Sequence, residues 1–274
     1  MELTKYTQEM FDNIPITEHF KLCPTGDYSA IKKIPGYCKF DNNCIFGIDC
    51  NFGDLCSFNK GCEFGDKCKF GGCCKFESGC KFGNECGFGE KYTSVCKCDV
   101  DCIYGYLCGF QPSCRFESKC IFGEKCVFGV CCGFKEECKF GEDCHFFDGC
   151  VFNTCNFKES CNFKGYIRFF NHCKFGKECV FSLYCEFRNR CYFDGACKFS
   201  EFEFTNIVSY DGPESPIQRV QFFHLSNGEI FVQWCGFCGS VNDWVDEVSK
   251  ECHGSKLENY LDLIPTAKAQ FCID

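Results

Sequence analysis

Long apolar runs are missing from this chain of 274 residues. No stretch of about 18 apolar residues occurs, so no membrane-spanning helix is predicted. The first residues, MELTKYTQEM, lack the charged and then apolar layout of a signal peptide. We therefore expect the protein to stay in the cytoplasm that made it. Histidine is also rare, with five in the chain, and we find no catalytic signature.

Cysteine, in contrast, is abundant, with 34 residues. In a secreted protein this count would predict a disulfide scaffold, but a chain without an export signal is expected to keep its thiols reduced. Our first interpretation is that the cysteines are buried free thiols that act as small apolar side chains. Disulfides between repeats and a thiolate ladder for soft metal ions remain alternatives. The sequence indicates no cofactor.

A six-residue repeat, Cys-x-Phe-x-x-x, organises the chain from Cys38 to Ser200. We count 25 units of Cys-x-(Phe/Tyr) and two degenerate ones, in which Cys98 replaces the ring and Ile167 replaces the cysteine. Cysteine and ring are two residues apart, so they lie on the same side of a short strand. Glycine often follows the ring, as expected at a corner. So short a strand cannot bury its face alone, which predicts stacking into a solenoid.

The order Phe-Gly-x-x-Cys-x resembles the hexapeptide repeat of left-handed parallel β-helix proteins. The resemblance covers residues 38–200, about 60% of the chain. It implies an all-β solenoid in which three hexads form one triangular coil, so the 27 hexads would form about nine coils. A four-residue insertion, Tyr92 to Val95, and a five-residue unit, Cys150 to Thr154, interrupt the period. We expect both interruptions at corners.

Three regions follow from this pattern. Residues 1–35 are expected to form an N-terminal cap with a short helix at Thr4–Phe11. Residues 36–200 form the hexapeptide-repeat β-helix. Residues 201–274 form an α+β module that caps or extends it.

The C-terminal module is predicted to have the order ββαα. The strands at 218–223 and 229–234 flank Ser226-Asn227-Gly228, which is a hairpin signal. Ser240 and Asp243 form a capping box before the first helix. Ser255 and Glu258 repeat this signature before a second helix, which we expect Pro265 to interrupt.

Charge is concentrated in the C-terminal module. Residues 201–274 contain 4 Lys and Arg against 12 Asp and Glu, which argues against direct nucleic-acid binding by this end. An acidic surface could instead occupy a basic nucleic-acid channel of a partner. The residues predicted to make this contact are Asp243, Asp246, Glu247 and Glu251.

A second candidate surface is apolar. When hexads are assigned to three sides, one side of the C-terminal half carries an unusual number of outward apolar residues. Such a strip is a candidate interface for a homo-oligomer or for a partner, although scattered surface apolar residues are also common. Its members are Val127, Val130, Phe147, Tyr166, Val180, Leu183 and Tyr184.

Two sets of residues are candidates for metal binding or catalysis. Cys235, Cys238, Cys252 and His253 offer the sulfur and nitrogen ligands that zinc prefers, and ordinary packing is the alternative. The hexapeptide-repeat family includes acyltransferases and gamma-type carbonic anhydrases, which use histidines projecting from the coils. This repeat region has His145 and His172, so the three-histidine metal site of the anhydrases cannot form. His145 remains a candidate general base.

The whole chain also loosely resembles Cys-x-Phe-Gly repeat proteins of bacteriophages and prophages. The shared order at the end is Cys235-Gly-Phe, an acidic helix at Asp243 to Glu247, and His253-Gly254. This resemblance implies a virus-encoded accessory protein in a bacterial cytoplasm. We expect a non-enzymatic protein that binds and inhibits a host defence or nucleic-acid-processing complex. The alternatives are an acyltransferase, a metal-thiolate protein and a structural solenoid.

The reduced state of the cysteines is testable by thiol titration. The denatured protein, purified without reductant, should react with a thiol reagent at all 34 cysteines, because the cytoplasm does not favour disulfides. The same titration after reduction is the control. A much lower count before reduction than after it would show that disulfides link the repeats.

Overall fold

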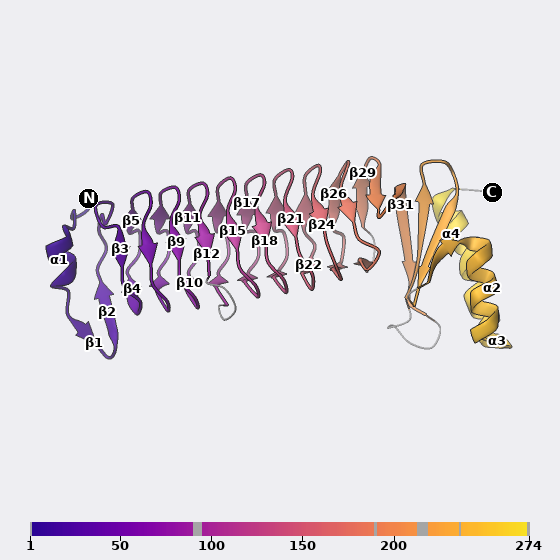
Figure 1. The fold of residues 1–274 in the computed structure, drawn as a ribbon, viewed down its shortest axis with the longest axis horizontal. Helices are drawn as coiled ribbons and strands as arrows, with labels where there is room; N and C mark the ends of the chain where they lie inside the picture. The colour runs from indigo at the N-terminus through magenta and orange to yellow at the C-terminus, as the bar shows by residue number, and fades with distance from the viewer. Residues whose placement is uncertain (1, 90–94, 189–190, 213–218, 236, 273–274) are drawn as a thin grey trace.

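The computed structural model describes residues 2–89, 95–188, 191–212, 219–235 and 237–272. They form a parallel β-solenoid of about ten turns, with the chain ends at opposite ends of the long axis (Figure 1). Three sheets run along the solenoid and make its three faces.

Each face is a stack of short strands, one from each coil. Face 1 contains β1 (Ile16–Thr17), β2 (Phe20–Cys23), β4 (Cys38–Phe40), β7 (Ser57–Phe58), β10 (Lys75–Phe76), β13 (Lys97–Cys98), β16 (Arg115–Phe116), β19 (Gly133–Phe134), β22 (Val151–Asn153), β25 (Arg168–Phe170) and β28 (Glu186–Phe187). Face 2 contains β5 (Ile45–Phe46), β8 (Glu63–Phe64), β11 (Lys81–Phe82), β14 (Ile103–Tyr104), β17 (Ile121–Phe122), β20 (Lys139–Phe140), β23 (Asn156–Phe157), β26 (Lys174–Gly176) and β29 (Tyr192–Asp194).

Face 3 has the same kind of stack and continues into the C-terminal module. Its parallel strands are β3 (Lys33–Ile34), β6 (Asn51–Phe52), β9 (Lys69–Phe70), β12 (Gly87–Phe88), β15 (Gly109–Phe110), β18 (Val127–Phe128), β21 (His145–Phe146), β24 (Asn162–Phe163), β27 (Val180–Phe181) and β30 (Cys197–Phe199). Antiparallel strands then follow: β31 (Phe202–Tyr210), β32 (Val220–Leu225), β33 (Ile230–Trp234) and β34 (Phe237–Ser240).

The strand register confirms three hexads in each coil. Val127 pairs with Gly109 on one side and His145 on the other, a spacing of 18 residues each. The five-residue unit shortens one coil, so that Val151 pairs with Arg168, 17 residues away. The insertion expected at Tyr92 to Val95 lies outside the described residues except for Val95.

The solenoid has one coil more than the hexads alone indicate. Tyr28 continues the ring column of Phe46, with centroids 5.6 Å apart, and β3 pairs with β6 so that Ile34 lies beside Phe52. The sequence pattern missed this coil because Gly26 and Lys32 stand where the repeat has cysteine. The left hand of the coil stays a prediction from the resemblance.

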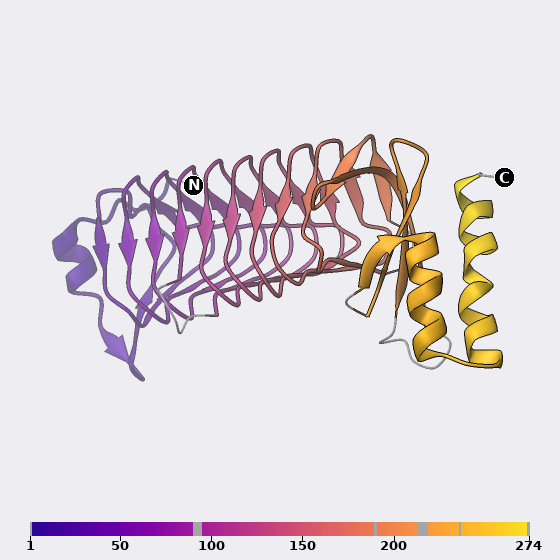
Figure 2. The same ribbon diagram turned by 45° about the vertical axis from the view of Figure 1, so that its right-hand side comes forward.

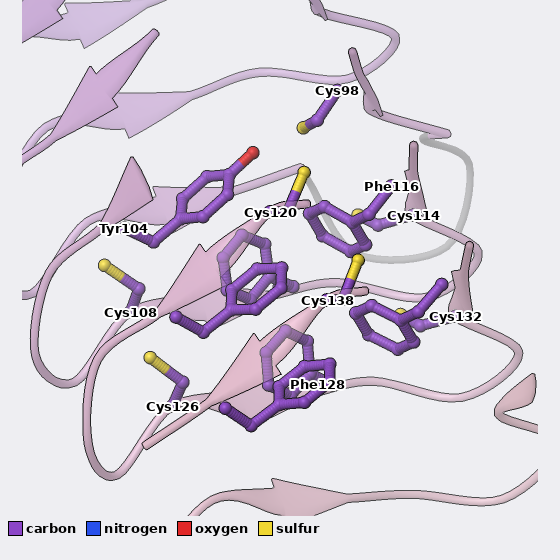
Figure 3. Packing of buried hydrophobic residues seen from close by; sticks show 14 of the residues in the cluster. Cys98, Tyr104, Cys108, Cys114, Phe116, Cys120, Cys126, Phe128, Cys132 and Cys138 are labelled. Carbon is purple, nitrogen blue, oxygen red and sulfur yellow. The ribbon is translucent and has the colours of Figure 1, made fainter. Parts of the chain in front are cut away.

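Aromatic rings fill the interior in three columns. The Phe128 ring stacks on Phe110 and Phe146 at 4.8 Å, and it meets Phe122 and Phe134 edge-on at 5.0 and 5.1 Å. Both arrangements suit the quadrupole of an aromatic ring. Figure 3 shows how these rings lie among the thiols.

The repeat thiols make hydrogen bonds to the corners. Cys126 Sγ donates to the carbonyl oxygen of Gly105 at 3.4 Å, and Cys144 Sγ donates to that of Gly123 at 3.4 Å. Among the described residues, no backbone N–H donates to either carbonyl. A buried carbonyl without a partner is costly, so the thiol serves as a small side chain and as a donor. All 34 cysteines are free thiols.

Cys98 and Tyr104, which stand where the repeat otherwise has phenylalanine, compensate each other. Cys98 occupies the ring position between Phe76 and Phe116, so one ring is missing from the column of face 1. The hydroxyl of Tyr104, which replaces a phenylalanine on face 2, points toward Cys98 (Figure 3). Burial raises the pKa of both groups, so both stay protonated at neutral pH.

Glycine at the corners permits close stacking of the coils. A Cβ atom on Gly123 would lie 2.7 Å from the backbone of Gly105 in the coil before it. That position cannot hold a larger residue without moving the coils apart.

The N-terminal end is closed by aromatic side chains. Helix α1 (Gln8–Asp12) begins after Thr7, whose side chain accepts a hydrogen bond from Met10 N. It directs Phe11 onto the ring column of Phe40, with the centroids 6.5 Å apart, and Tyr6 stacks on Tyr28 at 4.5 Å. The helix expected at Thr4–Phe11 therefore exists, but it begins four residues later and ends one residue later than expected.

The C-terminal module is a four-stranded sheet covered by helices (Figure 2). Phe223 of β32 packs on the last rings of the solenoid, whereas its neighbour Phe222 packs on Trp244 at 5.5 Å. This alternation gives the module a core of its own on the side away from the coils. The helices are α2 (Val241–Glu251), α3 (Ser255–Leu261) and α4 (Leu263–Phe271).

The predicted order ββαα is incomplete. Strand β31 was missed because a register shift between Phe204 and Asn206 disrupts its alternation. Strand β34 was missed because its sequence was interpreted as part of a CxxC motif.

The helix signals were partly right. Ser240 and Asp243 form the expected capping box. The second box is wrong, since Gly254 precedes α3 and no side chain caps that helix. The break falls at Asp262 rather than Pro265, because proline is tolerated in the first turn of α4.

The ring core predicts a large effect of one truncation. Phe128→Ala should lower the free energy of unfolding by roughly 3–5 kcal/mol, because Phe128 is fully buried between stacked rings. Val127→Ala, on the outer side of the same strand, is the control and should cost far less. Equal losses for both variants, measured by chemical denaturation, would contradict the ring core.

Candidate functional site

Five of the predicted apolar residues line one corner of the solenoid, between face 3 and face 1. They occupy the turns that follow β18, β21, β24 and β27, and they are Val130, Phe147, Tyr166, Leu183 and Tyr184. Tyr184 is the most exposed, at 65%, whereas Leu183 packs partly against the core. We call this row the apolar corner.

The other two apolar residues are not part of one patch. Val127 and Val180 lie on face 3, but His145 and Asn162 separate them on the intervening strands.

Sequence analysis missed the far end of the same corner. Tyr37 and Leu55 are exposed and precede β4 and β7, as Tyr184 precedes β28. Their 18-residue spacing was the signal that could have placed them. The apolar corner therefore has a counterpart near the N-terminal end.

The four acidic residues lie on the outer side of α2. Trp244 and Val248 are buried beneath the helix, whereas Asp246 and Glu251 are exposed. Asp243 accepts a hydrogen bond from Ser240 Oγ at 2.6 Å, and Glu247 pairs with Lys250 at 3.0 Å. Asp246 and Glu251 are therefore the better residues for probing a partner.

The candidate zinc residues differ in exposure. Trp234 of β33 pairs with Phe237 of β34, and Cys235 lies in a turn after β33. Cys235 and His253 are exposed, whereas Cys252 is buried at the end of α2. Burial raises the pKa of Cys235 and of Cys238, so neither thiol is activated at neutral pH. In the described part of the chain, no three His, Cys, Asp or Glu residues converge in a metal-binding group.

His145 projects outward from β21 on face 3. Its Nε2 lies 3.5 Å from a carboxylate oxygen of Asp143, and both side chains are partly exposed. A carboxylate beside an imidazole can orient it as a base. The grooves over faces 1 and 2, of about 950 and 590 Å³, do not include this pair.

A pocket of about 260 Å³ lies where the last coil meets the C-terminal sheet. It brings Tyr184 of the apolar corner together with Cys235 and Cys238. Glu251 lies close enough to Cys235 that its carboxylate helps to raise the pKa of the Cys235 thiol. The apolar corner and the acidic helix are therefore neighbours, which the sequence did not indicate.

Gln221 forms the structural centre of this junction. Its Oε1 accepts from Phe187 N at 2.6 Å, and its Nε2 donates to Cys185 O at 3.1 Å. These two backbone groups would otherwise bond to a further coil. The Gln221 amide thus replaces a peptide group and closes the edge of face 1. Gln233, which bonds to Gln221 and to Leu183 O, holds it in place.

The architecture defines the class as a parallel β-solenoid with an antiparallel C-terminal extension. No family model, no curated protein and no solved structure matches this chain. All helices of the described segments are too short or too polar to span a bilayer.

The closure by Gln221 is testable. Gln221→Leu should lower the free energy of unfolding by roughly 2–4 kcal/mol, because two buried backbone groups lose their partners at about 1–3 kcal/mol each. Ser209→Ala is the control, since Ser209 Oγ lies at the periphery, 3.4 Å from Gln221 Oε1. A loss for Gln221→Leu no larger than for the control, in chemical denaturation, would contradict this role.

Proposed function

We propose that this protein is a rigid, non-enzymatic binding protein that acts by contact with another protein. The observation that carries the proposal is the junction at the C-terminal end of the solenoid. There Tyr184 and Cys235 line one pocket, and Glu251 of α2 lies near Cys235, so exposed apolar and acidic groups occur at the same junction. Such mixed surfaces suit protein partners with basic and apolar groups.

The solenoid supports this role through its stiffness. Every described coil is held by stacked rings and by backbone hydrogen bonds to the next coil. A surface that is already ordered loses little conformational entropy when it binds. The stiffness of the solenoid is therefore an advantage for a binding function.

In its finer form, the proposal is that a phage encodes this protein to inhibit a host defence or nucleic-acid-processing complex. This form rests on the loose resemblance to phage Cys-x-Phe-Gly proteins. The acidic face of α2 supports it, because such a face can compete with nucleic acid for a basic channel.

An acyltransferase is the second candidate, and the His145–Asp143 pair favours it. Acyl-CoA turnover that is lost in His145→Ala would replace the binding proposal with this one. The metal-thiolate hypothesis would be supported by one equivalent of zinc that is lost in Cys235→Ser.

The proposal is tested by affinity capture from lysate of the native host, with and without nuclease, followed by mass spectrometry. The wild-type protein should retain a stoichiometric host protein complex that survives nuclease. Tyr184→Asp combined with Glu251→Lys should reduce the captured amount at least tenfold, because both sides of the junction surface change.

Tyr37→Asp is the matched control, since Tyr37 occupies the corresponding turn at the other end of the solenoid. It should leave capture unchanged. Equal capture by all three proteins would reject the junction surface, and the absence of any partner would reject the binding proposal.

A further inference from the structure

Face 1 carries two parallel rows of outward side chains. In each coil, one residue precedes the inward ring position and one follows it, so both point away from the core on the same strand. The first row is Lys39, Ser57, Lys75, Lys97, Arg115, Gly133, Val151, Arg168 and Glu186. The second row is Asp41, Asn59, Glu77, Asp99, Glu117, Lys135, Asn153, Phe170 and Arg188.

The two rows have opposite charge in coil after coil. Lys39, Lys75, Lys97 and Arg115 of the first row have an acidic residue two positions later in the second row. In the last coil the order is reversed but the signs still oppose, with Glu186 before Arg188. This arrangement is independent of the inward repeat, which requires only cysteine and a ring.

Three cations of the first row, Lys75, Lys97 and Arg115, have no acidic partner in the segments that the structure describes. Lys75 pairs in register with Lys97, and Lys97 with Arg115, so like charges are stacked about 4.8 Å apart. Such cross-strand pairs are destabilising. Among the described residues, no carboxylate lies within 4 Å of these three cations. On face 2, by contrast, Lys81 pairs with Glu63 at 2.9 Å.

The space above these rows is open. A groove of about 950 Å³ runs over face 1, lined by both rows from Ser57 and Asn59 to Arg168. Gly133 and Val151, which are small, form part of its lining. An occupant of this groove must present anions to the first row and cations to the second.

A second copy of the chain meets this requirement. A two-fold axis parallel to the solenoid, above the ring positions of face 1, places the first row of one copy opposite the second row of the other. Each coil then meets the same coil of its partner. A two-fold axis across the solenoid would instead set cations against cations.

The parallel arrangement produces a matched contact in most coils. Five coils give pairs of opposite charge, and Ser57 meets Asn59. In two of the five, a carboxylate also has an ion pair within its own chain, Glu117 with Lys135 and Glu186 with Arg188. Arg168 meets Phe170, whose ring already lies under Arg188 of its own chain. The remaining two coils bring Gly133 to Lys135 and Val151 to Asn153, so like charges never meet between these rows. We propose that face 1 is a self-association surface, on which two copies pack side by side in the same direction and in register.

This inference does not rest on the proposed function. If both hold, the parallel arrangement sets the two C-terminal modules at the same end of the dimer. A partner would then meet two junction surfaces at once, which raises its overall affinity when it offers two sites.

Sedimentation velocity over a range of concentrations tests the proposal. The wild-type protein should self-associate as a dimer at about 0.1 M salt. It should dissociate at about 1 M salt, where the Debye length falls from ~10 Å to ~3 Å.

Charge exchange at one coil tests the register. Lys75→Glu and Glu77→Lys should each weaken the dimer by about tenfold, because each creates two like-charge contacts per dimer. An equal mixture of the two variants should restore the affinity, since residue 75 of one copy then again opposes residue 77 of opposite sign. Neither side chain has an ion pair or side-chain hydrogen bond in the described part of the chain, so little else should change.

Lys81→Glu on face 2 is the matched control and should leave the dimer unchanged, and circular dichroism checks that each variant folds. A protein that is monomeric at all concentrations overturns the proposal. Dimers that tolerate both face 1 variants overturn it as well. Dimers that both variants weaken but the mixture does not restore overturn the parallel two-fold arrangement.

Discussion

The stack of inward rings is the interaction on which the rest of this structure depends. Phe128, for example, lies 4.8–5.1 Å from the rings above, below and beside it. The rings leave little room at the corners, so a thiol occupies nearly every one, with Ile167 as an exception. The thiol also meets a second demand, because it donates to a corner carbonyl that the backbone leaves without a partner. Ring and thiol together explain why the repeat has six residues and why cysteine recurs in it.

The core requires only two inward positions in each hexad. The residues at the outward positions can therefore vary without affecting the core. Face 1 uses them for two rows of opposite charge, and the corner between faces 3 and 1 uses them for exposed apolar side chains. The two ends must be covered in another way, because the unpaired strand edges of an open solenoid could pair with strands of another chain. Phe11 and Tyr6 cover the rings at one end, and the Gln221 amide replaces a peptide group at the other.

Prediction from sequence succeeded where each position of a pattern always has the same surroundings, as the inward positions of the hexad do. The triangular coil and its 18-residue register follow from the hexad, and the capping box at Ser240 and Asp243 follows from local hydrogen bonding. Prediction failed where the local pattern of residues is interrupted. Tyr28 and Ile34 belong to a coil in which Gly26 and Lys32 replace the repeat cysteines, and a bulge obscures the alternation of β31.

The sequence by itself determined the solenoid, because a ring and a small residue two positions apart bury one side of any short strand, whatever its neighbours are. It also determined which residues face outward. Only the tertiary structure decided which outward residues meet, since this depends on how insertions and deletions are absorbed and on how the C-terminal sheet docks. Tyr184 and Cys235 are 51 positions apart in the chain, yet they line one pocket. That proximity arises from Gln221 and Gln233, whose amides fix the sheet on the last coil through long-range hydrogen bonds.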